Sequence, residues 1–136
     1  MKIVADSYAW LEIATDTRSG RLAASILSQA ERVFVPDVVL AEVARKYLRE
    51  GTAESTVERR LAIISESAEV VPIDNRIALD AGKAYAELRG KAKKSGLRDP
   101  SLFDAIVLST ARDLGAKLLS SDQHFRGLPD TVWSTV

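Results

Sequence analysis

The chain contains no cysteine and a single histidine, His124, among its 136 residues. Without cysteine, neither a disulfide framework nor a thiolate metal site can form, and the composition suits a reducing compartment. A single histidine excludes the His-rich zinc sites. It also leaves His124 as the sole base for a Ser–His–Asp triad, and the G-x-S-x-G motif is missing. We interpret His124 as a surface or helix-start residue.

Long apolar runs and glycine-rich loops are also missing. No apolar stretch approaches the roughly 20 residues that span a bilayer, and Asp6 interrupts the N-terminal run before it resembles a signal-peptide core. Gly82-Lys83 lacks the upstream glycine of a P-loop. We therefore expect a soluble, cytoplasmic protein with no membrane segment. No linker or repeat divides the sequence, so residues 1–136 are expected to form one domain.

The chain also lacks net charge, since 19 basic residues balance 19 acidic ones. This balance counts against a protein that holds nucleic acid by overall positive charge. It is compatible with a site in which a few local acids bind a cation.

Short apolar runs alternate with longer segments of helical periodicity along the whole chain. This alternation favours an α/β fold, with a mainly parallel sheet covered by helices on both faces. Asp37 and Asp74 are predicted to cap the helices that follow them. The predicted strands are 2–5, 33–35, 70–73, 117–120 and 132–133, and the predicted helices are 8–14, 21–30, 38–50, 52–66, 75–94 and 101–114.

Two predicted strands end at an aspartate, in Ala5-Asp6-Ser7 and in Ser120-Ser121-Asp122. Ligands of open parallel sheets bind at the carboxyl ends of the strands. If both strands are central, Asp6 and Asp122 share one rim of the sheet. Each aspartate taken alone is also an ordinary N-cap for a following helix.

Two predicted helices each carry one acid in an apolar run. Glu42 lies within residues 38–44, and Asp104 lies within residues 102–108. Burying such a carboxylate costs several kcal/mol unless a cation or strong donors compensate it. Surface ion pairs are the ordinary alternative, with Lys46 for Glu42 and with Arg98 or Arg112 for Asp104. The four lone acids together favour a carboxylate cluster for a hard divalent cation.

These acids and their neighbours resemble the four acidic motifs of the PIN domain, over the whole chain. Among PIN domains, the small single-domain form is most similar to the VapC-type toxins of toxin–antitoxin pairs. The position of Ser120 is often threonine in that family, so the hydroxyl is kept. The four motifs here are Asp6-Ser7, Leu40-Ala41-Glu42-Val43, Phe103-Asp104-Ala105 and Ser120-Ser121-Asp122-Gln123-His124-Phe125.

The resemblance implies a three-layer α/β/α sandwich around a central sheet of four to five strands. It also implies an endoribonuclease that depends on Mg²⁺ or Mn²⁺, and a toxin that inhibits translation. A cation held by carboxylates lowers the pKa of a bound water and offsets charge on the scissile phosphate. In this interpretation Asp6, Asp104 and Asp122 ligate the metal, and Glu42 is a ligand or positions the attacking water.

Two hydroxyls, of Ser7 and Ser120, are expected to orient the ligating carboxylates. Asp99 is a further candidate for facing the site, although Asp-Pro is an ordinary turn element. An RNA substrate also requires positive charge beside the acids, and the basic residues near them are the candidates. Their alternative role is to complement a helix dipole in its last turn. The candidates are Arg45, Lys46, Arg49, Lys91, Lys93, Lys94 and Arg98.

The resemblance further implies a VapB-type antitoxin as partner and a homodimer. Tyr47, Ile63 and Ile64 are expected on exposed helix faces that contact such a partner. A stand-alone RNA-processing nuclease and a non-catalytic PIN-like scaffold that binds RNA or protein stay open as alternatives. The presence of all four acids counts against the scaffold. A haloacid dehalogenase-type phosphatase fits poorly, because Tyr8 stands where its second aspartate belongs.

Overall fold

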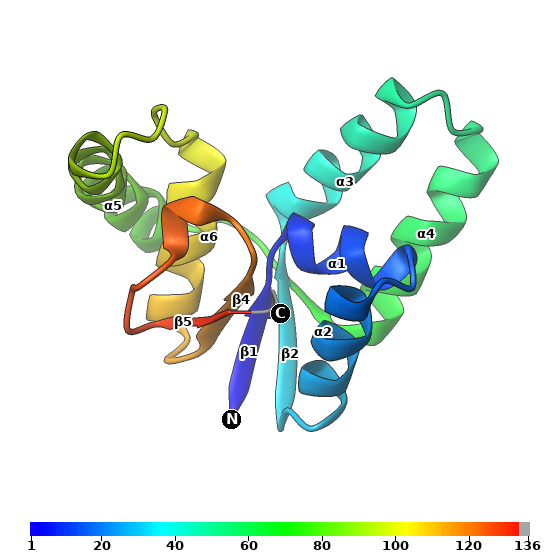
Figure 1. Cartoon of the computed structure of the whole chain (residues 1–136). Coiled ribbons are helices and arrows are strands. Elements are labelled where there is room, and N and C mark those ends of the chain that lie inside the picture. Colours follow the sequence, from blue (N-terminus) through cyan, green and yellow to red (C-terminus); the bar gives the residue numbers. More distant parts are fainter. Residues whose placement is uncertain (134–136) are drawn as a thin grey trace.

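The computed structural model describes residues 1–133, in which five strands alternate with six α-helices and one 3₁₀ turn (Figure 1). The strands are β1 (Lys2–Ala5), β2 (Arg32–Pro36), β3 (Glu69–Val71), β4 (Lys117–Ser120) and β5 (Thr131–Trp133). The helices are α1 (Ser7–Ala14), α2 (Arg18–Ser28), α3 (Asp37–Arg49), α4 (Glu54–Ser67), α5 (Asn75–Lys94) and α6 (Leu102–Asp113), and the 3₁₀ turn is η1 (Gln123–Phe125).

The sheet is entirely parallel among the described strands, in the order β3-β2-β1-β4-β5. Helices α1 to α4 cover one face, and α5 and α6 cover the other (Figure 1). The predicted three-layer α/β/α sandwich is thereby confirmed. The chain leaves β1 towards β2 and β3, and later returns to the other side of β1 as β4 and β5. The carboxyl ends of β1 and β4 therefore flank the point where the strand order reverses. No helix in the described part of the chain is long and apolar enough to span a bilayer.

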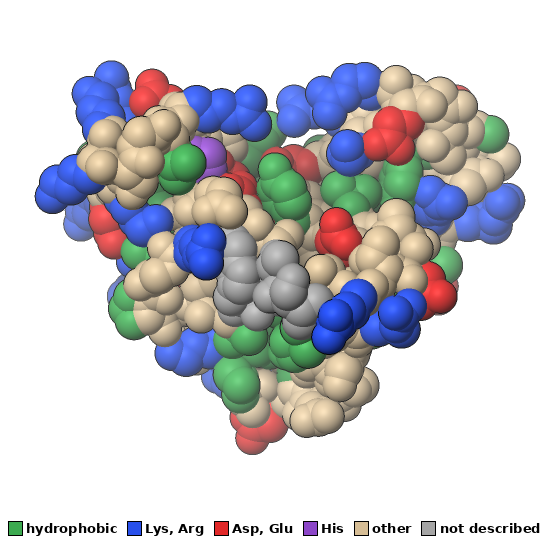
Figure 2. Space-filling view, in the orientation of Figure 1, with side chains coloured by type: hydrophobic (Ala, Val, Ile, Leu, Met, Phe, Trp, Pro, Cys, Tyr) green, Lys and Arg blue, Asp and Glu red, His purple; other side chains and the backbone are tan. Residues whose placement is uncertain are grey.

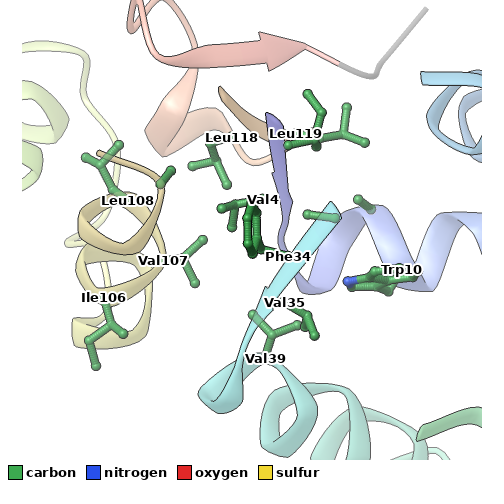
Figure 3. Close-up of a cluster of buried hydrophobic side chains, with 14 of the residues drawn as sticks. Val4, Trp10, Phe34, Val35, Val39, Ile106, Val107, Leu108, Leu118 and Leu119 are labelled. Carbon is green, nitrogen blue, oxygen red and sulfur yellow. The ribbon is translucent and has the colours of Figure 1, made fainter. Parts of the chain in front are cut away.

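The core divides between the two faces of the sheet with the two-residue period of a strand. Val4 pairs in register with Phe34 on β2 and with Leu118 on β4, and all three side chains are buried. They lie towards Val107 of α6, whereas Val35 lies towards α1 and α3 (Figure 3). Both faces of the sheet are therefore apolar, as a parallel sheet between two helical layers requires.

The apolar face of α3 corrects one expectation about partner contacts. Val39, Val43 and Tyr47 recur every four residues on α3 and are buried. Tyr47 is 7% exposed and Ile64 of α4 is 5% exposed, so both belong to the core rather than to a free surface. Ile63, at 60% exposed, is the only one of the three predicted contacts on the surface. The side chains of Tyr47 and Ile64 are buried because α3 packs against α4.

Among the helix starts that differ from the prediction, two are explained by hydrogen bonds near the start. Pro36, not Asp37, is the N-cap of α3, and it makes no side-chain cap. The carboxylate of Asp37 instead accepts a hydrogen bond from the backbone N–H of Ile73, at 3.3 Å, in the segment after β3. Helix α2 begins at Arg18, earlier than predicted, because the Thr17 hydroxyl accepts a hydrogen bond from the Gly20 N–H. The predicted cap of α5 by Asp74 is confirmed.

Helices α1 and α2 cross so closely that one position accepts only glycine. A Cβ at Gly20 would lie 2.0 Å from the carbonyl oxygen of Glu12, and backbone atoms cannot yield as a flexible side chain can. Gly82, on the exposed side of α5, would place a Cβ in open space.

We predict that Gly20→Ala lowers the free energy of unfolding by about 1–3 kcal/mol, the usual cost of overpacking. Gly82→Ala is the matched control and is expected to raise stability by about 0.5–1 kcal/mol, because alanine loses less backbone entropy in a helix. Urea denaturation followed by circular dichroism measures both. Equal or greater stability of Gly20→Ala would contradict the close crossing.

Candidate active site

Asp6 anchors the site where β1 turns into α1. Its side chain is 4% exposed and caps α1, with Oδ1 accepting the backbone N–H of Ala9 at 3.0 Å. Its Oδ2 accepts a short hydrogen bond from the hydroxyl of Ser120, the last residue of β4. Strands β1 and β4 are neighbours, so the two side chains meet across the sheet. The Asp6 carboxylate therefore has two roles: it caps α1, and the cap fixes the orientation in which it meets Ser120.

Ser120 connects Asp6 to Asp122. The Ser120 hydroxyl donates to Asp6 and accepts the backbone N–H of Asp122 at 2.9 Å. Asp122 in turn caps η1, with Oδ1 accepting the N–H of His124 at 2.9 Å. Phe125, fully buried, fixes η1 in the core. The structure therefore places Ser120 beside the acids, as its predicted role requires. Ser7, by contrast, makes no side-chain hydrogen bond with the acids in the described part of the chain.

Glu42 and Asp104 reach the same cleft from the two helical layers. Asp104 lies in the first turn of α6, and its Oδ2 accepts the backbone N–H of Ser101 at 2.9 Å in a capping box. Glu42, on α3, is half-buried. Neither acid forms the predicted surface ion pair: Lys46 binds Glu50, and Arg112 binds two other acids, Glu87 and Asp130.

The cleft has a volume of about 620 Å³ and opens between α3, α6, η1 and the loop after α5. Glu42, Asp104 and Asp122 line it, whereas Asp6 is buried and is not among the residues that line it. Asp99 also lines the cleft, and its Oδ2 lies 3.8 Å from Nε of Arg89. The remaining lining residues are Tyr8, Arg45, Leu97, Arg98, Pro100, Ser101, Ser121, Gln123 and His124.

His124 belongs to this site, although we interpreted it as a surface or helix-start residue. It does lie in η1, but its side chain is only 11% exposed. Its Nδ1 lies 2.9 Å from Oδ1 of Asp122, and its Nε2 lies 2.9 Å from the carbonyl oxygen of Arg98. Asp104, Asp122 and His124 can each point a ligand atom to within 4.8 Å of the others. Its position two residues after an aspartate was the available signal.

Negative charge at the site is incompletely compensated. Burial raises the pKa of Asp6 to about 7, against the hydrogen bonds from Ser120 and Ala9. Burial also raises the pKa of Glu42 to about 7, with a further increase from the charge of Asp104 and a decrease from Arg45. The pKa of Asp104 is raised too, mainly by burial.

The aromatic and imidazole groups of the cleft respond to the same acids. Burial raises the pKa of the Tyr8 phenol, and the charges of Asp122 and Asp104 raise it further, so the phenol stays neutral. Burial lowers the pKa of His124, but the Arg98 carbonyl and Asp122 more than offset this and raise it overall.

The donor set fits a hard divalent cation. Carboxylate oxygens are the preferred ligands of Mg²⁺ and Mn²⁺, and Asp104 and Asp122 are close enough to share one. Glu42 faces the same cleft, and the Ser120 hydroxyl links Asp122 to buried Asp6 by hydrogen bonds. A cation bound in the cleft would favour the ionised forms of Asp6 and Glu42, whose pKa values burial raises to about 7.

Basic residues lie along both shoulders of the cleft, above a floor of acids and His124 (Figure 2). Arg45 and Arg98 line the cleft itself. Lys46 and Arg49 line a second groove beside it, of about 340 Å³, together with Ser7. Lys91 donates to the backbone carbonyl of His124 at 3.3 Å and thus ties α5 to η1. Lys93 and Lys94, exposed at the end of α5, line neither the cleft nor the groove.

Comparison with known proteins identifies the family. The family model described as PIN domain matches residues 3–130. The chain belongs to the PIN domain family. No curated protein sequence matches it significantly.

Several solved structures with the same fold are described as toxins or toxin–antitoxin complexes. A toxin–antitoxin complex from Klebsiella pneumoniae is 19% identical, with a TM-score of 0.72 and coverage of 98% of each chain. VapBC-1 from nontypeable Haemophilus influenzae is 20% identical, with a TM-score of 0.71 and coverage of 98% of this PIN domain and 96% of that chain. Mycobacterium tuberculosis VapC20, described as a sarcin-ricin loop cleaving toxin, is 20% identical, with a TM-score of 0.68 and coverage of 93% and 95%.

The buried acids predict how the stability of this PIN domain depends on pH. Asp6 and Glu42 have folded-state pKa values of about 7, against about 4 in an unfolded chain. Between these values the folded state binds more protons than the unfolded state, so stability falls as pH rises through that window. We expect the metal-free protein to have a higher Tm at pH 6 than at pH 8.

Mg²⁺ or Mn²⁺ is expected to raise the Tm more at pH 8 than at pH 6, because it binds the ionised cluster of the folded state. Scanning fluorimetry measures this, with NaCl of equal ionic strength as the control for screening. The double variant Asp6→Asn, Glu42→Gln should lose most of the pH dependence. A Tm that rises with pH in the metal-free protein would contradict the assignment.

Proposed function

We propose that the chain is a divalent-metal-dependent endoribonuclease and the toxin of a VapBC-type pair, which inhibits translation in the cytoplasm. The observation that carries the proposal is the cleft in which Glu42, Asp104 and Asp122 converge above Asp6. Membership of the PIN domain family supports a nuclease. The toxin–antitoxin complexes among the similar structures support the toxin and a VapB-type partner. The similarity to VapC20, a sarcin-ricin loop cleaving toxin, supports an RNA substrate.

Asp104 and Asp122 would hold Mg²⁺ or Mn²⁺, with Glu42 as a further ligand or as the group that positions the attacking water. Bound there, the cation supplies an activated nucleophile and offsets charge on the phosphodiester. Asp6 and Ser120 keep Asp122 in place through two hydrogen bonds of the Ser120 hydroxyl. Ser7 has no such bond, so its proposed role is limited to the wall of the adjoining groove.

The basic residues divide by position. Arg45 and Arg98 stand on opposite sides of the acids and are proposed to contact the RNA backbone. Lys46 and Arg49 extend this contact along α3. Lys93 and Lys94 would act only on RNA that extends beyond the cleft, and Lys91 serves η1.

Metal-dependent RNA cleavage is the first test. Purified protein is incubated with a mixed pool of structured and single-stranded RNA, with Mg²⁺, with Mn²⁺ and with EDTA. We expect cleavage only with metal, and a loss of at least about 100-fold in Asp6→Asn and Asp104→Asn. Asp16→Asn is the matched control, because Asp16 is an exposed loop acid outside the cleft. Asp16 has a positive φ, which asparagine also tolerates.

Equal cleavage by all four proteins would assign the activity to a contaminant. No cleavage, together with no calorimetric metal binding, would leave the non-catalytic scaffold as the better interpretation.

Growth arrest distinguishes the toxin from a stand-alone processing nuclease. Induction of the chain alone in a bacterial host should stop growth and protein synthesis, and induction of Asp104→Asn should not. Radiolabelled amino-acid incorporation measures translation directly. Normal growth with an enzyme that cleaves RNA in vitro would favour the processing nuclease.

Light scattering after size exclusion tests the proposed homodimer, which a strict monomer at micromolar concentration would refute.

A further inference from the structure

Tyr8 occupies an unusual position for an aromatic side chain. It lies in the first turn of α1, two residues after Asp6, and is 44% exposed. Among the aromatic side chains that the structure describes, it alone is exposed. Aromatic rings are large apolar groups that folding normally buries, so an exposed ring at the mouth of a cleft suggests contact with a ligand.

The ring stands between two adjoining cavities. Tyr8, Glu42 and Arg45 line both the acidic cleft and the groove between α1 and α3. The charges of Asp122 and Asp104 act on the Tyr8 phenol, which places the ring beside the carboxylate cluster. A chain that leaves the cleft for the groove must therefore pass this ring.

The groove has the composition of a single-stranded nucleic-acid channel. Glu42, Arg45, Lys46 and Arg49 recur at helical spacing along one face of α3, and Leu11 of α1 lies opposite. Lys46 is paired with Glu50, whereas Arg45 and Arg49 have no ion pair within the described residues. Positions 45 and 49 are about one helical turn apart, roughly 6 Å along the axis of α3.

The remaining wall carries one acid. Glu12 lines the groove and accepts a hydrogen bond from the Thr17 hydroxyl at 2.7 Å. Cations along one wall and an aromatic ring at the entrance are the two elements that bind unpaired nucleotides, because phosphates need charge and bases need a flat apolar surface.

We propose that Tyr8 stacks on the base next to the scissile phosphate, and that this nucleotide enters the groove between α1 and α3 beside Arg45 and Arg49. The inference rests on the proposed function for the identity of the substrate as RNA. Stacking is tolerant of sequence, because every base presents a π-face. Tyr8 thus binds the substrate and takes no part in the metal site.

Cleavage kinetics provide the first arm of the test. A short single-stranded RNA with one cleavage site is compared with versions in which one flanking base is removed to leave an abasic ribose. We expect Tyr8→Leu to raise KM about tenfold with little change in kcat, and the conservative Tyr8→Phe to restore it. Leu79→Ala, 64% exposed on α5, is the control for loss of surface apolar area.

The abasic substrate identifies the partner of the ring. Removing the correct flanking base should cost the wild-type protein the same factor of about ten, and should cost Tyr8→Leu almost nothing further, because the ring and the base act as a pair. An abasic penalty that persists undiminished in Tyr8→Leu would overturn the proposal, as would an unchanged KM.

Equilibrium binding separates this inference from the nuclease itself. Fluorescence anisotropy of labelled RNA is measured with Asp104→Asn and with Asp104→Asn, Tyr8→Leu, so that no cleavage is needed. A Kd about tenfold larger in the double variant supports stacking, even if the wild-type protein cleaves no RNA and the proposed activity is wrong. Equal Kd values would refute stacking, even if the nuclease is confirmed.

Discussion

Like-charged carboxylates repel one another, and the hydroxyl of Ser120 holds two of them in place. It donates to buried Asp6 and accepts from the backbone of Asp122, so one side chain joins the ends of β1 and β4. Each aspartate also caps the helical segment that follows it. The Ala9 N–H and the Ser120 hydroxyl stabilise the charge of Asp6, but burial still raises the pKa of Asp6, and that of Glu42, to about 7. A cation bound by the cluster would favour the ionised carboxylates that burial disfavours.

The cleft depends on how the chain reverses direction at β1. Helices α1 to α4 pack on one face of the sheet and α5 and α6 on the other, so the two helical layers separate above the ends of β1 and β4 (Figure 1). Glu42 enters from one layer and Asp104 from the other. The ring of His124 connects η1 with the loop after α5, since it lies between the Asp122 carboxylate and the Arg98 carbonyl. The contact with the Arg98 carbonyl holds the loop after α5, from which Arg98 lines the cleft, whereas Arg45 lines it from α3.

Much of this arrangement could be predicted without coordinates. The alternation of apolar runs and helical segments predicted the parallel sheet, and it placed Asp6 and Asp122 at strand ends that share a rim. Local chemistry was also informative, as the cap of α5 by Asp74 shows. Predictions failed where the partner of a side chain lies far away in sequence. Asp37 bonds to Ile73 instead of capping α3, and Tyr47 and Ile64, which were expected on exposed helix faces, are buried between α3 and α4.

The sequence by itself determined the fold class, the four acids and the chemistry that oxygen ligands allow, because strand and helix periods and residue types are local properties. Only the tertiary structure decided which groups act together. It turned His124 inward, connected Asp6 to Asp122 through Ser120, and separated Lys93 and Lys94 from the cleft that Arg45 and Arg98 line. It also set Tyr8 between two cavities. Such neighbours come from different strands and helices, and their distances follow from strand order and helix packing, which no local pattern encodes.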